Sequence, residues 1–278
     1  MAEALQLPEP SGPVDLLSQA LRTDWMVLQD VDQIRFIAQL AGARFQWDDD
    51  TATPQERIRA LMVYWDVYDD DAGFASLPAA LAALGSDASL CTEIADFMAY
   101  RADRIRTAVH PLSPLAGTFP TPLCIHGVYS RRQILTGLGF NSFEKRRESR
   151  EGVAHHADLR VDALFVDLVK DPKHFSPSTL YHDYALTEEL FHWQSQNRTS
   201  PTSRTGQRYI HHVAQQERIL LFVREQKSNA YGGTSGYLFA GEATYIRYEG
   251  SQPMSIIWQL SHPLPGWIWR VAAKLRVG

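Results

Sequence analysis

The densest run of polar side chains in the 278-residue sequence lies between residues 191 and 212. It combines amides, hydroxyls, arginines and aromatic rings. In an extended segment His192, Gln194 and Gln196 would share one face. Side-chain amides offer paired donors and acceptors that match base edges, whereas Arg, Ser and Thr side chains suit phosphate contacts. These types in this density therefore predict nucleic-acid binding.

Within this run and close to it, each candidate has an expected role. Gln194 and Asn197 would read a base edge, Arg208 would hold a phosphate, and Tyr209 would stack on a base. The candidate binding residues are Tyr184, His192, Gln194, Ser195, Asn197, Thr199, Arg208, Tyr209 and Arg224. Two structural alternatives stay open: the run is a polar loop that caps strand ends, and Arg224 forms an ion pair with Glu225.

Histidines and acids of the second half offer metal chemistry as an alternative. The adjacent pairs His155–His156 and His211–His212 would point to opposite faces of a strand, so neither binds one metal easily with both rings. A zinc site assembled from distant His and Asp stays open. Because Asp167 and Lys170 do not share a strand face, the acids around them fit a nuclease poorly. We assign no catalytic residue, metal ligand or cofactor.

Several catalytic motifs are absent from the sequence. There is no Gly-Lys dipeptide and hence no phosphate-binding P-loop, and neither Gly-x-Ser-x-Gly nor His-Glu-x-x-His occurs. The sequence therefore predicts no ATPase activity, and it favours a binding protein over an enzyme.

Charge is distributed unevenly along the chain. Residues 1–123 carry 8 Lys and Arg against 18 Asp and Glu, a net charge of −10. Residues 124–278 carry 19 against 14, a net charge of +5, and 14 of those 19 are Arg. This asymmetry predicts that only the second half meets a polyanion.

The elements that must position these side chains divide the chain into two parts. Apolar residues recur at helical spacing over 14–40 and 58–65, and Thr53-Pro54 is a typical helix start. Four prolines between 111 and 122 stiffen a connector. After a short helix from Ser130 to Gly139, runs at 163–169, 219–223, 237–241, 243–248 and 254–260 read as strands. We expect an α+β fold: a helical, acidic domain over 1–110, a linker over 111–123 and a β-rich, barrel-like domain over 124–278.

Composition is that of a cytoplasmic globular protein. Apolar residues make up 45% and charged residues 21% of the chain, and no apolar run approaches the ~20 residues that span a bilayer. The N-terminus lacks the pattern of a signal peptide. With only Cys91 and Cys124, a disulfide framework and a Cys-rich zinc site are excluded.

Several runs in the second half carry a family resemblance. They are Tyr181–Ala185, Glu188–Asn197, Thr205–His211, Leu220–Glu225 and Pro253–Trp258, with the helix from Tyr129 to Gly139 before them. Over about residues 124–265 they resemble the domain of unknown function that follows DEAD/DEAH-box helicase motors in bacterial proteins. Residues 14–110 resemble the helical stretch that links the motor to this domain.

The resemblance implies a setting of DNA processing, restriction or phage defence. It implies DNA as the partner, together with a helicase or nuclease that is a separate subunit or a missing part of the same protein. The strand order resembles PUA-like or SRA-like barrels, which read modified or flipped bases, and this analogy implies modified DNA as a target. The alternatives are a metal-dependent nuclease and a protein-interaction module in which the acidic helices dock a partner. No membrane partner is expected.

Overall fold

The computed structural model describes residues 12–68, 72–147, 149, 151–169, 183–229 and 233–274. Lys170, Tyr181 and His182, which the sequence analysis named, lie outside these residues. The chain forms two compact units. One comprises Met1–Arg106 and Arg132–Arg147, and the other comprises Thr107–Arg131 and Glu148–Gly278.

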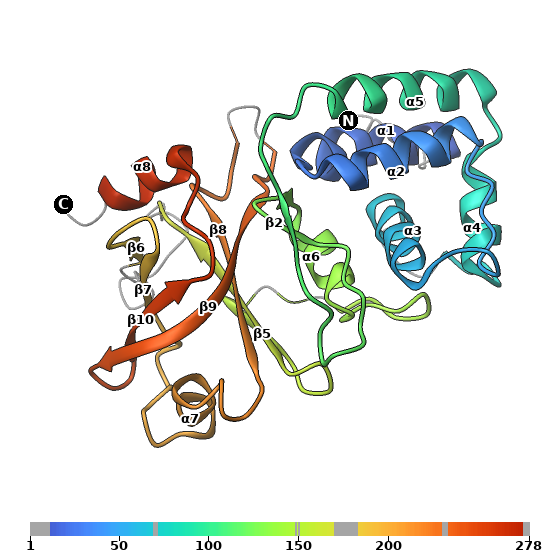
Figure 1. Ribbon diagram of the computed structural model, residues 1–278. Coiled ribbons are helices and arrows are strands. Elements are labelled where there is room, and N and C mark those ends of the chain that lie inside the picture. Colours follow the sequence, from blue (N-terminus) through green and yellow to red (C-terminus); the bar gives the residue numbers. More distant parts are fainter. Residues whose placement is uncertain are drawn as a thin grey trace, which may run out of the picture. The chain divides into compact units, whose positions relative to one another are not determined.

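The first unit is helical. Its elements are α1 (Pro13–Ala20), a π-helical turn (Leu21–Trp25), α2 (Val31–Gly42), α3 (Pro54–Val67), α4 (Leu77–Leu84), α5 (Ala88–Ala102) and most of α6 (Arg131–Gly137) (Figure 1). The helices are amphipathic and bury one apolar face each, including Leu17 on α1 and Ile34 and Ile37 on α2.

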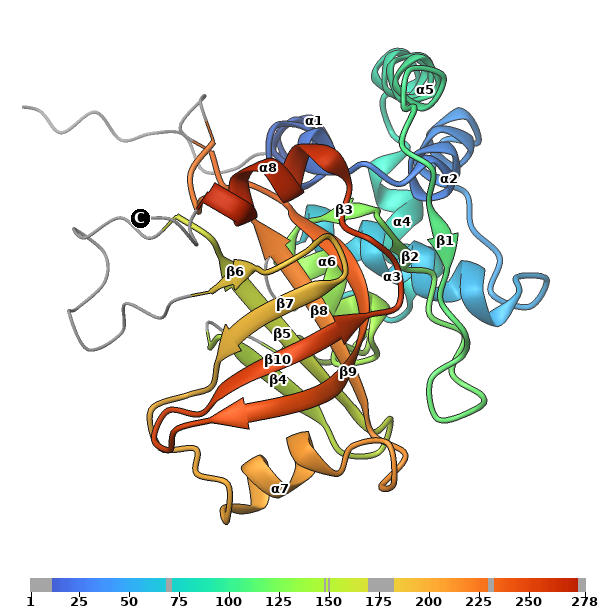
Figure 2. The ribbon, with the colours of Figure 1, turned by 60° about the vertical axis from the view of Figure 1, so that its left-hand side comes forward.

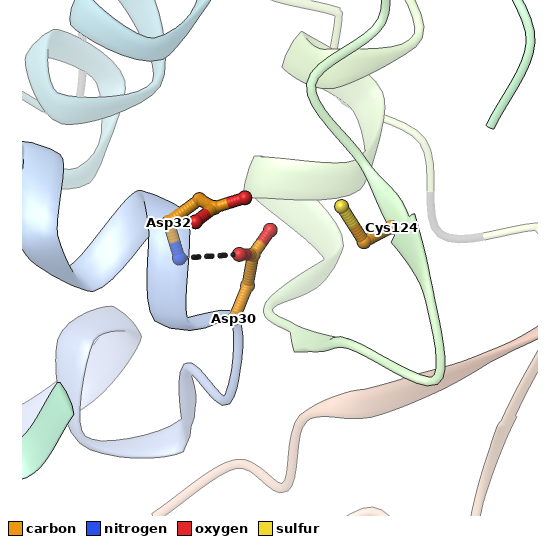
Figure 3. Close-up of side chains that lie close together, drawn as sticks. All are labelled: Asp30, Asp32 and Cys124. Carbon is orange, nitrogen blue, oxygen red and sulfur yellow. Dashed lines mark hydrogen bonds between the residues drawn. The ribbon is translucent and has the colours of Figure 1, made fainter. Parts of the chain in front are cut away.

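Local side chains fix where these helices begin. Asp30 caps α2 because its carboxylate accepts a hydrogen bond from the backbone N of Asp32 at 2.9 Å (Figure 3). Thr53 caps α3 and forms a capping box with Glu56, while Pro54 occupies the first turn. The helix start expected at Thr53-Pro54 is thus confirmed.

The segment 132–147 joins the helical unit although it follows the proline-rich stretch. Gln133 Nε2 and Trp25 Nε1 both donate to Asp66 Oδ2, each at 2.9 Å. Trp65 Nε1 donates to the carbonyl of Ser142 at 3.0 Å. Two buried side chains of α3, Asp66 and Trp65, therefore depend on partners that lie 67 and 77 residues later in the chain.

The second unit is built on one curled sheet. Its strands are β3 (Val128–Tyr129), β4 (Val153–His156), β5 (Val161–Asp167), β6 (Tyr184–Ala185), β7 (Leu190–Gln194), β8 (Arg218–Arg224), β9 (Tyr237–Glu249) and β10 (Ser255–Leu260). They follow the order β4-β5-β8-β9-β10-β7-β6, and β3 pairs with β9. The pairing of β5 with β8 is parallel, and the other described pairings are antiparallel. A two-stranded sheet of β1 (His110–Pro111) and β2 (Cys124–Ile125) and the helices α7 (Arg204–Ile210) and α8 (Gly266–Lys274) complete the unit.

The long strand β9 gives the sheet its curl. Its register shifts once against β8, near Gly241, and once against β10, at Ile246. Such bulges increase local twist and bend the strand, and Figure 2 shows β9 and β10 curving together. The concave side holds an apolar core that includes Leu164, Leu221 and Trp258.

The expected α+β fold, with helices first and strands second, is confirmed. The barrel-like closure that the PUA-like comparison implied is wrong for the described strands, because their pairing forms an open path from β4 to β6. No helix in the described ranges is long and apolar enough to cross a membrane.

Candidate nucleic-acid interface

The convex face of the β6-β7-β10-β9 half of the sheet gathers aromatic, amide and basic side chains. Directly opposed residues on antiparallel strands point to the same face. Tyr184 opposes His192, His192 opposes Ile257, and Ile257 opposes Arg247, so these four form one row across four strands. Figure 2 shows β7, β10 and β9 side by side in this part of the sheet. We call the row and its neighbours the outer sheet face.

A second row runs beside the first. Gln194 opposes Ser255, and Ser255 opposes Glu249. The amide Nε2 of Gln194 donates to Ser255 Oγ at 3.3 Å, which fixes the amide across the strand pair. Burial along β7 alternates, with His192 and Gln194 partly exposed and Phe191 and Trp193 buried. The outer sheet face therefore carries both His192 and Gln194, as their spacing predicts, whereas Gln196 lies beyond β7 and its Oε1 accepts from Thr199 and the buried Tyr209.

The rings of Tyr184 and His192 are stacked on each other. Their centroids are 4.5 Å apart and their planes differ by 12°. Ile257, which is buried, continues the row, and Arg247, whose side chain is 62% exposed, ends it. Aromatic rings on adjacent strands, with a guanidinium at the far end of the row, are the groups on which unpaired bases stack while a phosphate is held at the edge.

The other aromatic candidate lies on the opposite side of the sheet. Tyr209 on α7 is fully buried, and its ring packs edge-on against Trp193 and Trp258 at centroid distances of 5.4 and 6.2 Å. Its hydroxyl donates to Gln196 Oε1 at 3.4 Å, and burial raises its pKa far above the usual value. The ring of Tyr209 is thus part of the core and offers no face to a base.

The loop after β7 is tied down by its own polar groups. Ser195 is buried, and its Oγ accepts a hydrogen bond from the backbone N of Met254 at 2.9 Å. Thr199 is also buried and donates to Gln196 Oε1 at 3.3 Å. Ser203 caps α7 by accepting from the backbone N of Gly206. Only Asn197 of the candidates in this loop is exposed, so the geometry favours the capping-loop alternative for Ser195 and Thr199.

The guanidinium of Arg208 forms an ion pair with a buried carboxylate. Its Nε and Nη2 donate to the two carboxylate oxygens of Asp162 at 2.6 and 3.0 Å. Asp162 lies on β5 and is completely buried, so the fork supplies the charge and the donors that the carboxylate needs. The geometry thus gives Arg208 a structural partner in place of a phosphate.

Arg224 has the same arrangement at the other end of β5. Its Nε and Nη2 donate to Asp167 at 2.6 and 3.1 Å, and Tyr237 donates its hydroxyl to the same carboxylate at 3.2 Å. Asp167 and Arg224 are opposed in the parallel pairing of β5 with β8. An ion pair was the structural alternative for Arg224, but its partner is Asp167, and the neighbouring Glu225 is exposed.

One cluster near Arg208 has the composition of a metal site. His155, Asp162 and Glu217 each offer a ligand atom, and these atoms lie within 4.8 Å of one another. Burial raises the pKa of Glu217, while the neighbouring His155 opposes this shift. However, both oxygens of Asp162 already accept from Arg208. A cation there would lie against the guanidinium of Arg208 and be repelled by it. The charge of Asp162 is thus already neutralised by Arg208, and the cluster is better explained as a structural ion-pair network.

A surface cavity of about 620 Å³ opens beside the β4–β5 hairpin. Its polar lining comes from Asp158, Arg160, Gln216 and Arg218. Arg160 donates to Gln216 at 2.8 Å, and Arg218 pairs with Glu242 at 2.5 Å. No aromatic side chain lines this cavity, so it lacks the stacking surface that flipped-base pockets use.

The sequence candidates therefore separate into two groups. Tyr184, His192 and Gln194 come together on the outer sheet face, whereas Ser195, Thr199, Tyr209, Arg208 and Arg224 are held in structural contacts. Asn197 belongs to neither group and is exposed in the loop after β7. Ile257 and Arg247 were missed, because Ile257 opposes His192, which lies 65 residues earlier in the chain, and Arg247 in turn opposes Ile257. Neither β9 nor β10 alternates regularly between buried and exposed residues, so no local pattern indicated this row.

A family model described as "Domain of unknown function (DUF3427)" matches residues 123–272. That range includes every strand of the outer sheet face. No curated protein matches the chain.

Proposed function

The chain belongs to the DUF3427 family, and we propose that it binds nucleic acid, with single-stranded DNA as the preferred ligand, through the outer sheet face. The observation that carries the proposal is the row Tyr184, His192, Ile257 and Arg247 across four strands. Open antiparallel sheets that bind single strands use the same parts: aromatic rings on adjacent strands for bases, and arginines at the edge for phosphates.

Single strands fit this face better than a duplex. Stacking needs unpaired bases, and the rings of Tyr184 and His192, which stack on each other, leave the outer face of each ring as the place where such a base would stack. Gln194, at the end of β7, is the group that would distinguish one base edge from another. The exposed Arg198 follows it in the chain and would extend the phosphate contacts that Arg247 begins.

The wider setting that we propose is cytoplasmic DNA processing, including restriction and phage defence. The resemblance to helicase-associated domains supports it, and so does the net charge of +5 over residues 124–278. In that setting a helicase would generate the single strand that the sheet face binds. Modified DNA is a further candidate ligand, which modified and unmodified oligonucleotides would distinguish.

Fluorescence anisotropy with labelled oligonucleotides tests the proposal. The full chain should bind a single strand more tightly than the matching duplex, with an affinity that falls as salt rises. The double variant Tyr184→Ala/His192→Ala should lose roughly 1–3 kcal/mol of binding free energy for each base that no longer stacks. Arg247→Ala should reduce the salt dependence by about one phosphate contact.

Two controls make the result specific. Tyr100→Ala removes an exposed aromatic side chain from the helical unit and should bind as the unchanged chain does. Circular dichroism should show that each variant stays folded. Unchanged affinity of the double variant for single-stranded DNA would contradict the proposal. Equal binding of duplex and single strand would contradict the proposed preference for unpaired bases.

The nuclease alternative depends on the cluster of His155, Asp162 and Glu217. Arg208 argues against it, since its guanidinium occupies both oxygens of Asp162. Cleavage of labelled DNA in Mg²⁺ or Mn²⁺ that Glu217→Gln abolishes would favour the nuclease. The protein-interaction alternative predicts that the chain binds no DNA even at low salt.

A further inference from the structure

Three histidines from distant parts of the sequence meet in the β-rich unit. The rings of His110, His126 and His262 have centroid separations of 5.5 Å (His110 to His126), 4.5 Å (His110 to His262) and 6.0 Å (His126 to His262). All three belong to the same compact unit. They lie apart from the outer sheet face, and neither the sequence motifs nor the family match gives them a role.

The backbone holds each ring in place. His110 lies on β1 opposite Ile125, and His126 follows Ile125 directly at the end of β2. The backbone N of His126 donates to the carbonyl of Phe239 on β9 at 2.7 Å. Ser261, directly before His262, donates its backbone N to the carbonyl of Glu242 at 2.9 Å. The backbones of His126 and of the residue before His262 are thus both hydrogen-bonded to β9, and His110 lies on the strand that pairs with β2.

His126 is the least accessible of the three and the most constrained. It is 8% exposed, and its Nε2 is buried with no hydrogen-bond partner among the described residues. Its φ of 70° lies in the left-handed region, which non-glycine residues occupy at a cost of about 1–3 kcal/mol. A buried ring nitrogen without a partner leaves a polar group unsatisfied, and a metal ion would satisfy it.

We propose that His110, His126 and His262 bind a divalent transition-metal ion of the Zn²⁺ type. In a three-histidine zinc site each nitrogen lies about 2.0–2.1 Å from the metal, which places the centroids of neighbouring rings roughly 5 Å apart. The observed separations, 4.5 to 6.0 Å, bracket that value. The nitrogens of the three rings do not all lie within 4.8 Å of one another, so binding would require the rings to rotate until one nitrogen of each points toward the ion.

The donor set selects the class of metal. Three neutral imidazoles suit Zn²⁺, Cu²⁺ and Ni²⁺, whereas Mg²⁺ and Ca²⁺ prefer oxygen ligands. Ser261 Oγ lies 3.0 Å from His262 Nδ1 and leaves Nε2 of that ring for the ion.

The site leaves one position for a ligand from solution. His110 is exposed and His262 partly exposed, so this side of the cluster faces solvent. Three histidines plus a water is the arrangement of zinc sites that keep an open position. The ion would also join β1–β2 to the end of β10, which strand pairing alone does not connect directly.

Calorimetric titration of the untagged, chelator-treated full chain with Zn²⁺ tests the proposal. One equivalent should bind. His110→Ala and His262→Ala should each weaken that binding by at least about tenfold, because even outer-shell partners of a zinc ligand cost that much when removed. Co²⁺ provides a second measurement, since its visible absorption should show a tetrahedral site that both variants lose.

The controls separate this cluster from the other histidines. His211→Ala removes an exposed histidine elsewhere and should leave Zn²⁺ binding unchanged. His155→Ala alters the His155, Asp162 and Glu217 cluster and should also have no effect. Absence of Zn²⁺ binding, or binding that survives both His110→Ala and His262→Ala, would overturn the proposal. The titration contains no DNA, so its outcome is independent of the proposed function.

Discussion

Arg208 and Asp162 depend on each other inside the β-rich unit. Asp162 is completely buried, and both of its oxygens accept hydrogen bonds from the Arg208 fork. An unpaired carboxylate at this position would keep the full cost of its lost hydration. The ion pair therefore specifies where α7 docks against the concave side of the sheet.

Arg208→Ala is expected to destabilise the chain strongly. Removing one partner of a buried ion pair costs about 3–5 kcal/mol, and unfolding in urea should show a loss of that size. Arg204→Ala, on the same helix but exposed, should change stability by about 0.5 kcal/mol or less. Equal unfolding free energies of the two variants would show that the Arg208 guanidinium does not stabilise the buried Asp162 carboxylate.

Asp66 gives the helical unit a dependence on pH. Burial raises its pKa well above the usual value, and the charge of Asp24 raises it further, against hydrogen bonds from Gln133 and Trp25. A carboxyl whose folded pKa is raised holds its proton more tightly in the folded state. Its contribution is therefore complete below the unfolded pKa of about 3.9 and is lost as the pH rises through the folded pKa.

Asp66→Asn should flatten that dependence, because the amide is neutral at every pH while its oxygen can still accept from Trp25 and Gln133. Free energies of unfolding measured from about pH 4.5 to about pH 8 should fall less steeply in the variant than in the unchanged chain. Asp96→Asn, at an exposed position, is the control. Parallel pH profiles for Asp66→Asn and the unchanged chain would contradict this account.

At the residue scale, the presence of polar contacts was easier to predict than whether those contacts are internal or face solvent. The residue types around 191–212 indicated polar contacts, and polar contacts are present. Sequence did not reveal that most of them are internal, because burial of Arg208 and Tyr209 depends on strands that begin tens of residues away. Only His192 and Gln194 could be assigned to a common face from local spacing alone.

At the scale of elements, the sequence pattern located β5, β8, β9 and β10 but misjudged their limits, and it did not predict the other described strands. Residues 237–241 and 243–248 read as two strands because Gly241 between them looks like a turn. They form the single strand β9, which bends at the bulge near Gly241 and continues. The helix α7 was missed because its seven residues are mostly polar and too few to show a period.

Gly241 is expected to be intolerant of a side chain. Its φ is 118°, and a Cβ there would lie 3.0 Å from Ser261 Oγ and 3.4 Å from Ile125 Cγ2. Gly241→Ala should therefore lower the unfolding free energy by about 1–3 kcal/mol. Gly266→Ala is the matched control, since a Cβ at that glycine meets nothing within 4 Å. If both variants melt at the same temperature, β9 tolerates a side chain at its bend.

At the scale of the whole molecule, the chain crosses between its two units more than once. The helical unit takes in residues 132–147, which follow the first segment of the β-rich unit. Proline density indicated a connector at 111–122, but contacts across almost 70 residues, such as Gln133 with Asp66, cannot be read from composition.

A fragment of residues 1–110 should therefore fold poorly. It lacks the partners of Asp66 and Trp65 that Gln133 and Ser142 supply. Thermal denaturation followed by circular dichroism should show a broad transition for this fragment and a cooperative one for residues 1–147. A sharp, high-temperature transition for residues 1–110 would mean that α6 contributes little to the helical unit.

Photo-crosslinking tests the central proposal most directly. Single-stranded DNA carrying 5-bromouracil would be irradiated with the full chain, and the crosslinked peptides would be identified by mass spectrometry. We predict crosslinks to the peptides that contain Tyr184 and His192, because their rings lie where bases would stack. Crosslinks confined to the helical unit, or to the cavity lined by Arg160 and Arg218, with none on the outer sheet face, would contradict the proposal.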